Sequence, residues 1–225
     1  MTINIGINFG DYIFLAADTR TTYFFSSAQK YTDETQKIQK TKMGLVTGAG
    51  YKNLLDEVKY QLAQENIRHT DQIIQVIKQQ ADTFSIQASP KIREVINTTG
   101  WLLTYLTQVE EKPILRLALI HPKFKYVPAL YKKNKPCVIM PFGANGKVTK
   151  LVLDTIKKNI KPLGNVSEIQ DNIIYHTGVI KGIISSVSKN FQSVSPTFHI
   201  GVHTIDGKMG ISTRVENEKL TIHTS

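Results

Sequence analysis

Residues 1–20 read MTINIGINFGDYIFLAADTR, and this stretch predicts two paired strands. Apolar side chains alternate with polar or small ones over residues 2–9, which is the period-two pattern of a β-strand. Gly10 and Asp11 supply a tight turn, and a second apolar run follows over residues 12–18. We therefore predict an antiparallel hairpin, and we expect its first strand to fix the amino terminus in space.

The rest of the chain alternates between groups of strands and groups of helices. Short strands are predicted at residues 36–40 and 44–47, and apolar residues at helical spacing follow around 54–62 and 73–84. The later predicted elements are strands beginning at Trp101, Pro113, Lys125 and Pro136, helices over about 146–161 and 169–187, and strands beginning at Thr197, Lys208 and Leu220. Runs of strands followed by runs of helices predict an α+β fold. Two facing sheets with helices outside each give a four-layer αββα sandwich, in one domain over residues 1–225.

Composition and charge limit the class of protein. The formal net charge is +10, but lysine dominates the basic clusters and no aromatic residues are interleaved with them, so we expect no nucleic-acid partner. No apolar run is long enough to span a bilayer, and the start lacks the pattern of a signal peptide, so we expect no membrane association. The single cysteine, Cys137, excludes an internal disulfide, and we expect a buried inert thiol and a cytoplasmic location.

Two sequence patterns that suggest a metal site or a phosphate-binding loop do not have the residue spacing that such sites need. His199 and His203 would lie about 13 Å apart on a strand, which is too far to share one ion. The segment GANGKVTK resembles a phosphate-binding loop, but Pro141 stands where that loop needs its first glycine. We therefore predict no metal and no cofactor.

Thr2 is the candidate nucleophile. Methionine before a small residue is normally removed, so we expect the hydroxyl and the free α-amine to belong to the same residue. Because an α-amine has a pKa of about 7.7–8.0, much of it is neutral at physiological pH and can act as the base for the hydroxyl. Such a site also needs a lysine anchored by a carboxylate, and backbone N–H donors for an oxyanion.

These parts follow in order along the chain. Asp18 stands at the end of the second predicted strand, in LAADTR, and Lys37 lies on the next strand, in DETQKIQK. Gly48 and Gly50, in VTGAGY, lie where a strand gives way to a helix, a position that leaves backbone N–H groups free. The order therefore predicts a hydrolytic site around Thr2.

At these residues the chain resembles the proteasome β-subunit family of N-terminal nucleophile hydrolases, and most closely its bacterial single-subunit members. The shared segments are TINIGI, LAADTR, QKIQK and TGAG. The resemblance implies that Thr2 is the nucleophile, that Asp18 holds the catalytic lysine, Lys37, and that the N–H of Gly50 serves the oxyanion. The spacing to Lys37 is a few residues longer than in the family, which leaves Lys30 as a rival.

The resemblance also implies substrate-binding and supporting residues. Thr22 falls where family members bind an extended peptide through the main chain, and Gly48 belongs to the same binding surface. Asn190 and Ser193, in NFQS, match an aspartate and a serine that support the amine of the nucleophile. Asn190 supplies no charge there, and GANG at residues 143–146 lacks a serine that the family often has.

The function implied is hydrolysis of peptide bonds in peptides or unfolded proteins. The reaction would pass through an acyl ester on Thr2, within a homo-oligomeric ring and without a cofactor. Two alternatives stay open: a non-catalytic scaffold subunit, and an amidase or transpeptidase of narrow specificity, which would use the same acyl-enzyme. The sequence does not identify an ATPase partner, a ring size or a substrate.

Overall fold

A computed structural model describes residues 2–25, 28–64, 67, 69–141, 143–161, 169–212, 215 and 222–224, with backbone alone for 23–25, 28–30 and 222–224. The strands are β1 (Asn4–Asn8), β2 (Tyr12–Asp18), β3 (Thr21–Phe25), β4 (Ala28–Thr32), β5 (Gln39–Lys40), β6 (Leu45–Ala49), β7 (Gly100–Val109), β8 (Lys112–Ile120), β9 (Ala129–Tyr131), β10 (Pro136–Ile139), β11 (Phe198–Thr204), β12 (Met209–Ser212) and β13 (Ile222–Thr224). The helices are α1 (Lys52–Gln64), α2 (Thr70–Ile86), α3 (Pro90–Asn97), the 3₁₀ turn η1 (Pro122–Phe124), α4 (Gly146–Asn159) and α5 (Ile169–Asn190).

The predicted hairpin at the start of the chain is present as β1 and β2. Its antiparallel register pairs Asn4 with Ala17 and Asn8 with Ile13. β1 and β2 are interior strands of a six-stranded sheet with the order β10-β1-β2-β11-β12-β13. Every residue of both strands is buried, because β1 and β2 have neighbours on both edges and packing on both faces.

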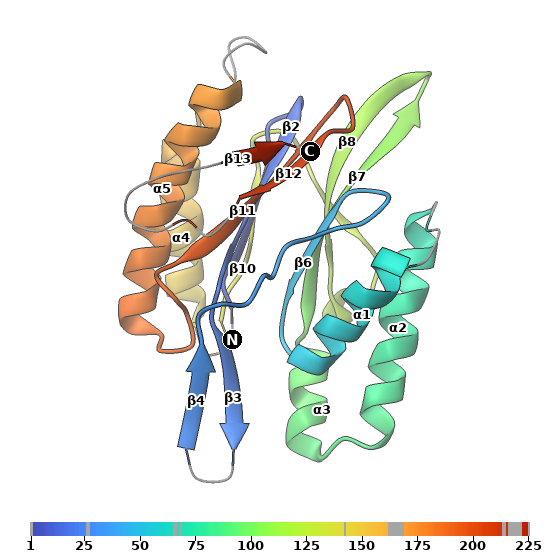
Figure 1. The fold of residues 1–225 in the computed structure, drawn as a ribbon, viewed down its shortest axis with the longest axis vertical. Coiled ribbons are helices and arrows are strands. Elements are labelled where there is room, and N and C mark those ends of the chain that lie inside the picture. The colour runs from blue at the N-terminus through green and yellow to red at the C-terminus, as the bar shows by residue number, and fades with distance from the viewer. Residues whose placement is uncertain are drawn as a thin grey trace.

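Helices cover the outer faces of two sheets that face each other (Figure 1). α4 and α5 lie against the six-stranded sheet, and α1, α2 and α3 lie beside the five-stranded sheet β5-β6-β7-β8-β9. Three apolar clusters fill the spaces between these layers, represented by Phe14 with Ile180, Leu15 with Leu117, and Ile77 with Trp101. The described residues thus confirm a mixed helix-and-sheet fold, with five α-helices and three antiparallel sheets.

The segment between β2 and β5 differs from the prediction. It forms the two-stranded hairpin β3–β4, where the sequence predicted a polar connection. Figure 1 shows this hairpin extending beyond the two main sheets. The strand predicted at residues 36–40 is also shorter, because β5 contains only Gln39 and Lys40.

Two other predicted elements change in length. The strand predicted from Lys125 is wrong at its start, because Lys125 and Tyr126 adopt left-handed φ angles of 53° and 62° after η1. Only Ala129–Tyr131 pairs with β8. After α2, Ser89 caps the eight-residue helix α3 by accepting a hydrogen bond from Ile92 N at 3.4 Å, with Pro90 at its first position.

Two further expectations concern the environment of Cys137 and the presence of membrane-spanning helices. Cys137 is fully buried on β10, and burial raises the pKa of its thiol to about 12. The structure confirms the predicted burial of Cys137, and a raised pKa favours the protonated thiol. In the described part of the chain, no helix combines the length and apolar character needed to cross a membrane.

Candidate active site

The register of the first hairpin brings Thr2 beside the end of β2. Because Asn4 pairs with Ala17, Ile3 lies opposite Asp18, and Asp18 N donates to Ile3 O at 3.3 Å. Ile3 packs in the cluster beneath α4 and α5. The alternation of a strand therefore directs the neighbouring side chain of Thr2 to the opposite face, between the sheets.

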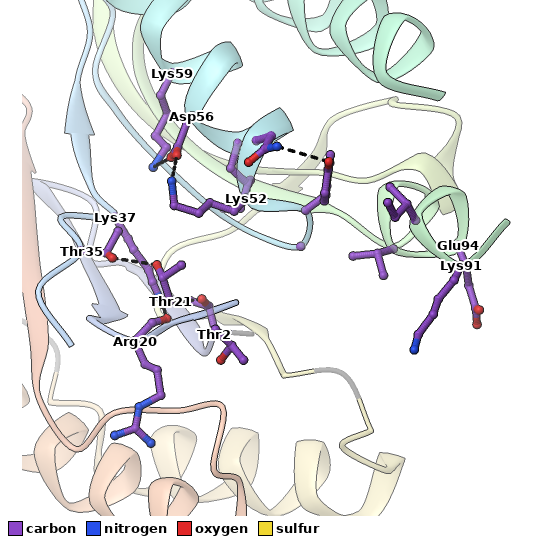
Figure 2. Close-up of a pocket in the computed structure, with 18 of the residues that line it drawn as sticks. Thr2, Arg20, Thr21, Thr35, Lys37, Lys52, Asp56, Lys59, Lys91 and Glu94 are labelled. Carbon is purple, nitrogen blue, oxygen red and sulfur yellow. Dashed lines mark hydrogen bonds and ion pairs between the residues drawn. The ribbon is translucent and has the colours of Figure 1, made fainter. Parts of the chain in front are cut away.

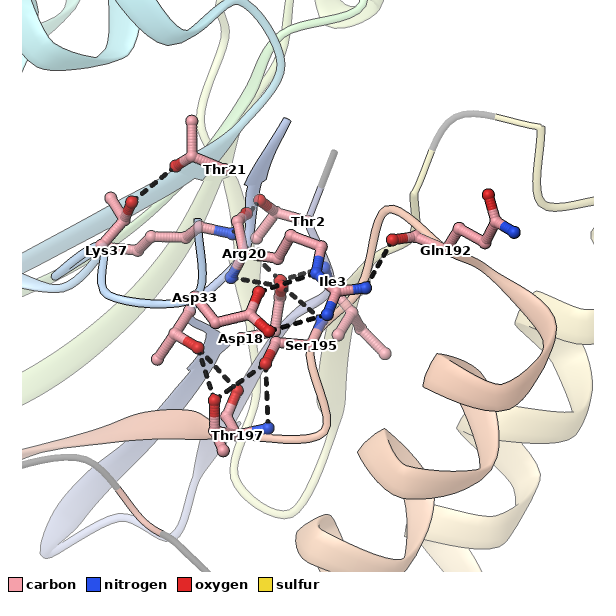
Figure 3. Close-up of polar contacts among 12 residues, drawn as sticks. Thr2, Ile3, Asp18, Arg20, Thr21, Asp33, Lys37, Gln192, Ser195 and Thr197 are labelled. Atoms are coloured by element: carbon pink, nitrogen blue, oxygen red, sulfur yellow. Dashed lines mark hydrogen bonds and ion pairs between the residues drawn. The ribbon is translucent and has the colours of Figure 1, made fainter. Parts of the chain in front are cut away.

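Asp18 is fully buried, and four donors hold its carboxylate (Figure 3). Oδ1 accepts hydrogen bonds from Ile3 N at 2.9 Å and from Lys37 Nζ at 3.1 Å. Oδ2 accepts from Arg20 N at 3.0 Å and from Ser195 N at 3.1 Å. A buried charge is tolerated when it is paired and hydrogen-bonded, so this carboxylate is a fixed anchor for the lysine.

Lys37 connects Asp18 to Thr2. Its Nζ donates to Thr2 Oγ1 at 2.5 Å, to Asp18 Oδ1 at 3.1 Å and to the carbonyl oxygen of Arg20. These three acceptors use the three protons of an ammonium group. Burial lowers the pKa of Lys37, and the Asp18 carboxylate opposes that shift. The hydroxyl of Thr2 therefore accepts a charge-assisted hydrogen bond, which favours its alkoxide form.

Arg20 holds the turn that supplies the third acceptor for Lys37. Its guanidinium forms a bidentate pair with Asp33, with both N–O distances at 2.7 Å, and donates to Gln192 O at 2.6 Å. The same group lies 3.9 Å from the centre of the Tyr31 ring. Sequence analysis missed Asp33, because one acidic residue in a polar connection has no distinguishing pattern.

A group of hydroxyls lies behind Asp18 and was also missed. Thr197 Oγ1 lies 2.6 Å from Thr19 Oγ1 and 2.8 Å from Ser195 Oγ. Thr197 N also donates to Ser195 Oγ at 3.2 Å. These bonds fix the segment before β11 against the end of β2, and they position the N–H of Ser195 that binds Asp18. The alternation of hydroxyl residues in SVSPT was the available signal in the sequence.

Asn190 does not support Thr2, so that prediction is wrong. It is the last residue of α5, and its Nδ2 donates to Ser186 O of the same helix at 2.9 Å. Its side chain lines a different cavity, between α4 and α5. Within the described ranges, Ser193 makes no hydrogen bond to Asp18, and Ser195 binds this carboxylate instead.

A cavity of about 710 Å³ opens beside Thr2 and Lys37 (Figure 2). Thr22, Gly48 and Gly50, the other predicted site residues, also line it. Thr22 lies on β3, where it pairs with Tyr31. The structure thus brings six of the eight predicted residues to one cavity or to its supporting carboxylate, and the role of each residue stays a prediction.

Gly50 occupies a position that only glycine fits. Its φ is 144°, and a Cβ there would lie 2.1 Å from Thr99 Oγ1. In the described part of the chain its N–H makes no backbone hydrogen bond, whereas the next N–H, of Tyr51, donates to Thr99 Oγ1 at 3.0 Å. At Gly48 a Cβ would lie 2.5 Å from Leu55 Cδ2, so glycine lets α1 approach the strand closely.

The GANG segment and Lys30 are the two remaining features that the sequence analysis singled out. In GANG, Asn145 caps α4 by accepting a hydrogen bond from Val148 N at 3.0 Å, and the segment does not line the cavity. Lys30 lies on β4 opposite Tyr23, and its side chain is outside the described part. The lysine that the structure places at Thr2 is Lys37.

His203 is a buried histidine on β11. His203 Nδ1 lies 2.8 Å from Thr104 Oγ1, and that hydroxyl accepts a hydrogen bond from Leu45 N at 2.8 Å. The donor between Thr104 Oγ1 and His203 Nδ1 depends on the tautomer of the ring, because a hydroxyl oxygen can accept two hydrogen bonds and also donate one. Burial lowers the pKa of His203 to about 4. Among the described residues, no three histidine, cysteine, aspartate or glutamate side chains gather as metal ligands would.

Comparison with solved structures shows that other proteins have a similar fold. No family model and no curated protein matches this chain. It is similar to Anbu from Hyphomicrobium sp. strain MC1, with a TM-score of 0.59 and 14% identity to a (Gly-1) mutant and a TM-score of 0.57 and 13% identity to a second Anbu structure. Each comparison covers 100% of this chain and 87% of the Anbu chain.

These findings correct the family assignment made from the sequence. No family model supports membership of the proteasome β-subunit family or a place among its bacterial single-subunit members, and two structures of Anbu are among those with a similar fold. At 13–14% identity the likeness shows only that this chain has a fold similar to that of Anbu. Short segments such as LAADTR and TGAG mark a turn and a strand-to-helix junction, and those features belong to a fold more than to one family.

Proposed function

We propose that this chain is a threonine-type amide hydrolase with the four-layer αββα architecture of N-terminal nucleophile enzymes. Thr2 would become the nucleophile once Met1 has been removed. One observation carries the proposal: a buried ammonium, Lys37 Nζ, donates to Thr2 Oγ1 at 2.5 Å and to the buried carboxylate of Asp18 at 3.1 Å. A surface threonine needs no such arrangement, whereas a nucleophilic hydroxyl does.

The mechanism follows from the position of each group. The neutral α-amine of Thr2, through a water molecule, takes the hydroxyl proton, and Oγ1 attacks the carbonyl carbon of an amide bond. Lys37 would stabilise the developing alkoxide, and the N–H of Gly50 would stabilise the oxyanion. The proton then passes from the α-amine to the leaving nitrogen, and the C–N bond breaks to give an ester on Thr2. Water hydrolyses this ester and restores the hydroxyl.

Peptides and unfolded segments are the proposed substrates. Thr21 and Thr22 of β3 line the cavity, and an extended peptide can pair with such a strand through its main chain. If an amine replaced water in the second step, the same ester would support transpeptidation, so product analysis separates these two reactions. The homo-oligomeric ring stays a prediction, which native mass spectrometry of the purified protein tests.

The first experiment is intact-mass measurement before and after treatment with a peptide epoxyketone or a β-lactone. We expect loss of Met1 and one adduct per chain, mapped to Thr2 by peptide sequencing and absent from Thr2→Ala. Retained Met1, or a free Thr2 that ignores both probes, would overturn the proposal in favour of a non-catalytic scaffold. The absence of Asn190 from the site is the observation that favours that second candidate.

A further inference from the structure

The α1 wall of the active-site cavity carries three charged residues. Lys52, Asp56 and Lys59 all line the cavity, and their spacing places them on one face of the helix. We call these three residues the α1 charge cluster. Figure 2 shows them above Thr21 and Lys37, with both lysines directed toward Asp56.

Lys59 is the buried member of this cluster. Its side chain is 8% exposed, compared with 38% for Lys52 and 45% for Asp56. Lys52 Nζ forms a hydrogen-bonded ion pair with Asp56 Oδ2, whereas Lys59 Nζ lies 3.8 Å from Asp56 Oδ1. This second distance exceeds that of a hydrogen bond, so the buried lysine has the weaker contact with the shared carboxylate.

Among the described side chains that line the cavity or support it, positive charges outnumber negative charges by one. Beside Thr2, Lys37 is paired with Asp18, and Arg20 is paired with Asp33. In the α1 charge cluster, two lysines share one aspartate. At the far end of the cavity, α3 contributes one lysine and one glutamate of opposite charge (Figure 2). The surplus positive charge therefore lies on the α1 wall.

Burial makes this surplus charge unfavourable in the empty cavity. Desolvation lowers the pKa of Lys59, Lys37 and Lys52 act in the same direction, and Asp56 opposes them. A second carboxylate entering the cavity would bring another negative charge to the α1 wall and to Lys59. Ion pairs and hydrogen bonds to charged groups are strongest when both partners are withdrawn from water.

We propose that the cavity selects substrates with a carboxylate side chain, glutamate or aspartate, on the residue whose carbonyl Thr2 attacks, and that Lys59 determines this specificity. The inference rests on the proposed function. A carbonyl held between Thr2 Oγ1 and the N–H of Gly50 would direct the side chain of its residue into the same cavity, toward α1. The volume, about 710 Å³, lies within the usual range for ligand sites.

Cleavage of matched substrates tests the specificity directly. The substrates are fluorogenic tetrapeptides that differ only in the residue before the dye, which is Glu, Gln, Leu or Arg. For the protein with Met1 removed we expect kcat/KM for Glu to exceed that for Gln by about tenfold or more, as for a hydrogen bond between charged groups. Equal or faster cleavage of the Gln, Leu or Arg substrate would overturn the inferred specificity, while the proposed hydrolase function would still stand.

Substitution of Lys59 assigns the effect to one residue. Lys59→Met should bring the Glu to Gln ratio close to one, while Lys59→Arg should keep the preference. Lys91→Met is the matched control, because Lys91 is an exposed cation on α3 that lines the same cavity. An unchanged ratio in folded Lys59→Met, or a lost ratio in Lys91→Met, would overturn the role of Lys59.

A binding measurement separates this inference from the hydrolase proposal. Fluorescence anisotropy with Thr2→Ala compares peptide amides that end in Glu or in Gln, and we expect at least about tenfold tighter binding of the Glu peptide. Preferential Glu binding without any cleavage by the unaltered protein would support the selective cavity and overturn the hydrolase. Absence of both binding preference and cleavage would overturn both.

Discussion

Lys37 Nζ donates a hydrogen bond to Thr2 Oγ1 at 2.5 Å, although the two residues are 35 positions apart in the sequence. The same ammonium bonds to Asp18, which lies opposite Ile3 in the first hairpin. A strand pairing and a buried ion pair therefore converge on one hydroxyl. This convergence makes the function of the site testable with substitutions at each of its parts.

Replacement of the nucleophile should abolish turnover and leave the fold intact. In Thr2→Ala we expect probe labelling to disappear and hydrolysis to fall by about 10³-fold or more, as when other covalent nucleophiles are removed. Thr2→Ser keeps a hydroxyl and should keep measurable labelling. Mass spectrometry and a peptide assay give the result, with far-UV circular dichroism as the control for folding. Residual turnover in Thr2→Ala equal to that of the unaltered protein would disprove the mechanism.

Removal of Lys37 should affect stability as well as activity. Lys37→Met leaves the Asp18 carboxylate buried without its cation, and breaking a buried pair in this way costs about 3–5 kcal/mol. The double variant Asp18→Asn/Lys37→Met removes both charges, so it should recover part of the lost unfolding free energy but no activity. Urea unfolding and probe labelling measure the two effects. A double variant with no better stability than Lys37→Met would argue against the pairing.

The backbone at Gly50 gives a test that does not depend on chemistry. Gly50→Ala places a Cβ 2.1 Å from Thr99 Oγ1 and at a φ of 144°, so we expect a loss of at least about 2 kcal/mol in unfolding free energy. Gly178 is the control, because a Cβ there meets nothing within 4 Å on α5. Gly178→Ala should raise the unfolding free energy by about 0.5–1 kcal/mol. Equal effects of the two substitutions would contradict this account of Gly50.

Sequence analysis located the parts of the site that depend on local pattern. The alternation around β1 and the turn at Gly10 specify the register that places Thr2 beside Asp18, and the strand-to-helix junction specifies Gly50. Asp33 and Ser195 could not be found in this way, because their contacts join segments that are distant in the sequence. The position expected for Asn190 was wrong because the end of α5 could not be located from the sequence.

That error came from the end of α5. The helix continues through Asn190, so the side chain turns back to its own helix, and the segment that reaches Asp18 begins later. Helical periodicity predicts the buried face of a helix but not the residue at which the chain leaves it. The family assignment from the sequence failed because the short matching segments mark turns and strand-to-helix junctions, which are features of a fold and not of one family.

Arg20 should act on the reaction through the position of Lys37. Its guanidinium binds Asp33 in a bidentate pair, and its carbonyl oxygen accepts from Lys37 Nζ. Arg20→Lys keeps the charge but loses the fork geometry, so we expect kcat to fall by about tenfold with a smaller change in KM. Steady-state kinetics measure this split. A change in KM alone would instead assign Arg20 to substrate binding.

Stability should fall in mild acid because His203 is buried in its neutral form. Burial lowers its pKa to about 4 in the folded protein, whereas the unfolded value is about 6.5. Between these two values the unfolded chain binds a proton that the folded chain does not, so the unfolding free energy should decrease as pH falls, by up to about 3 kcal/mol. Urea unfolding from pH 7 to pH 4 measures this loss. His203→Gln should flatten the profile. An equally steep profile in His203→Gln would show that other groups carry the acid sensitivity.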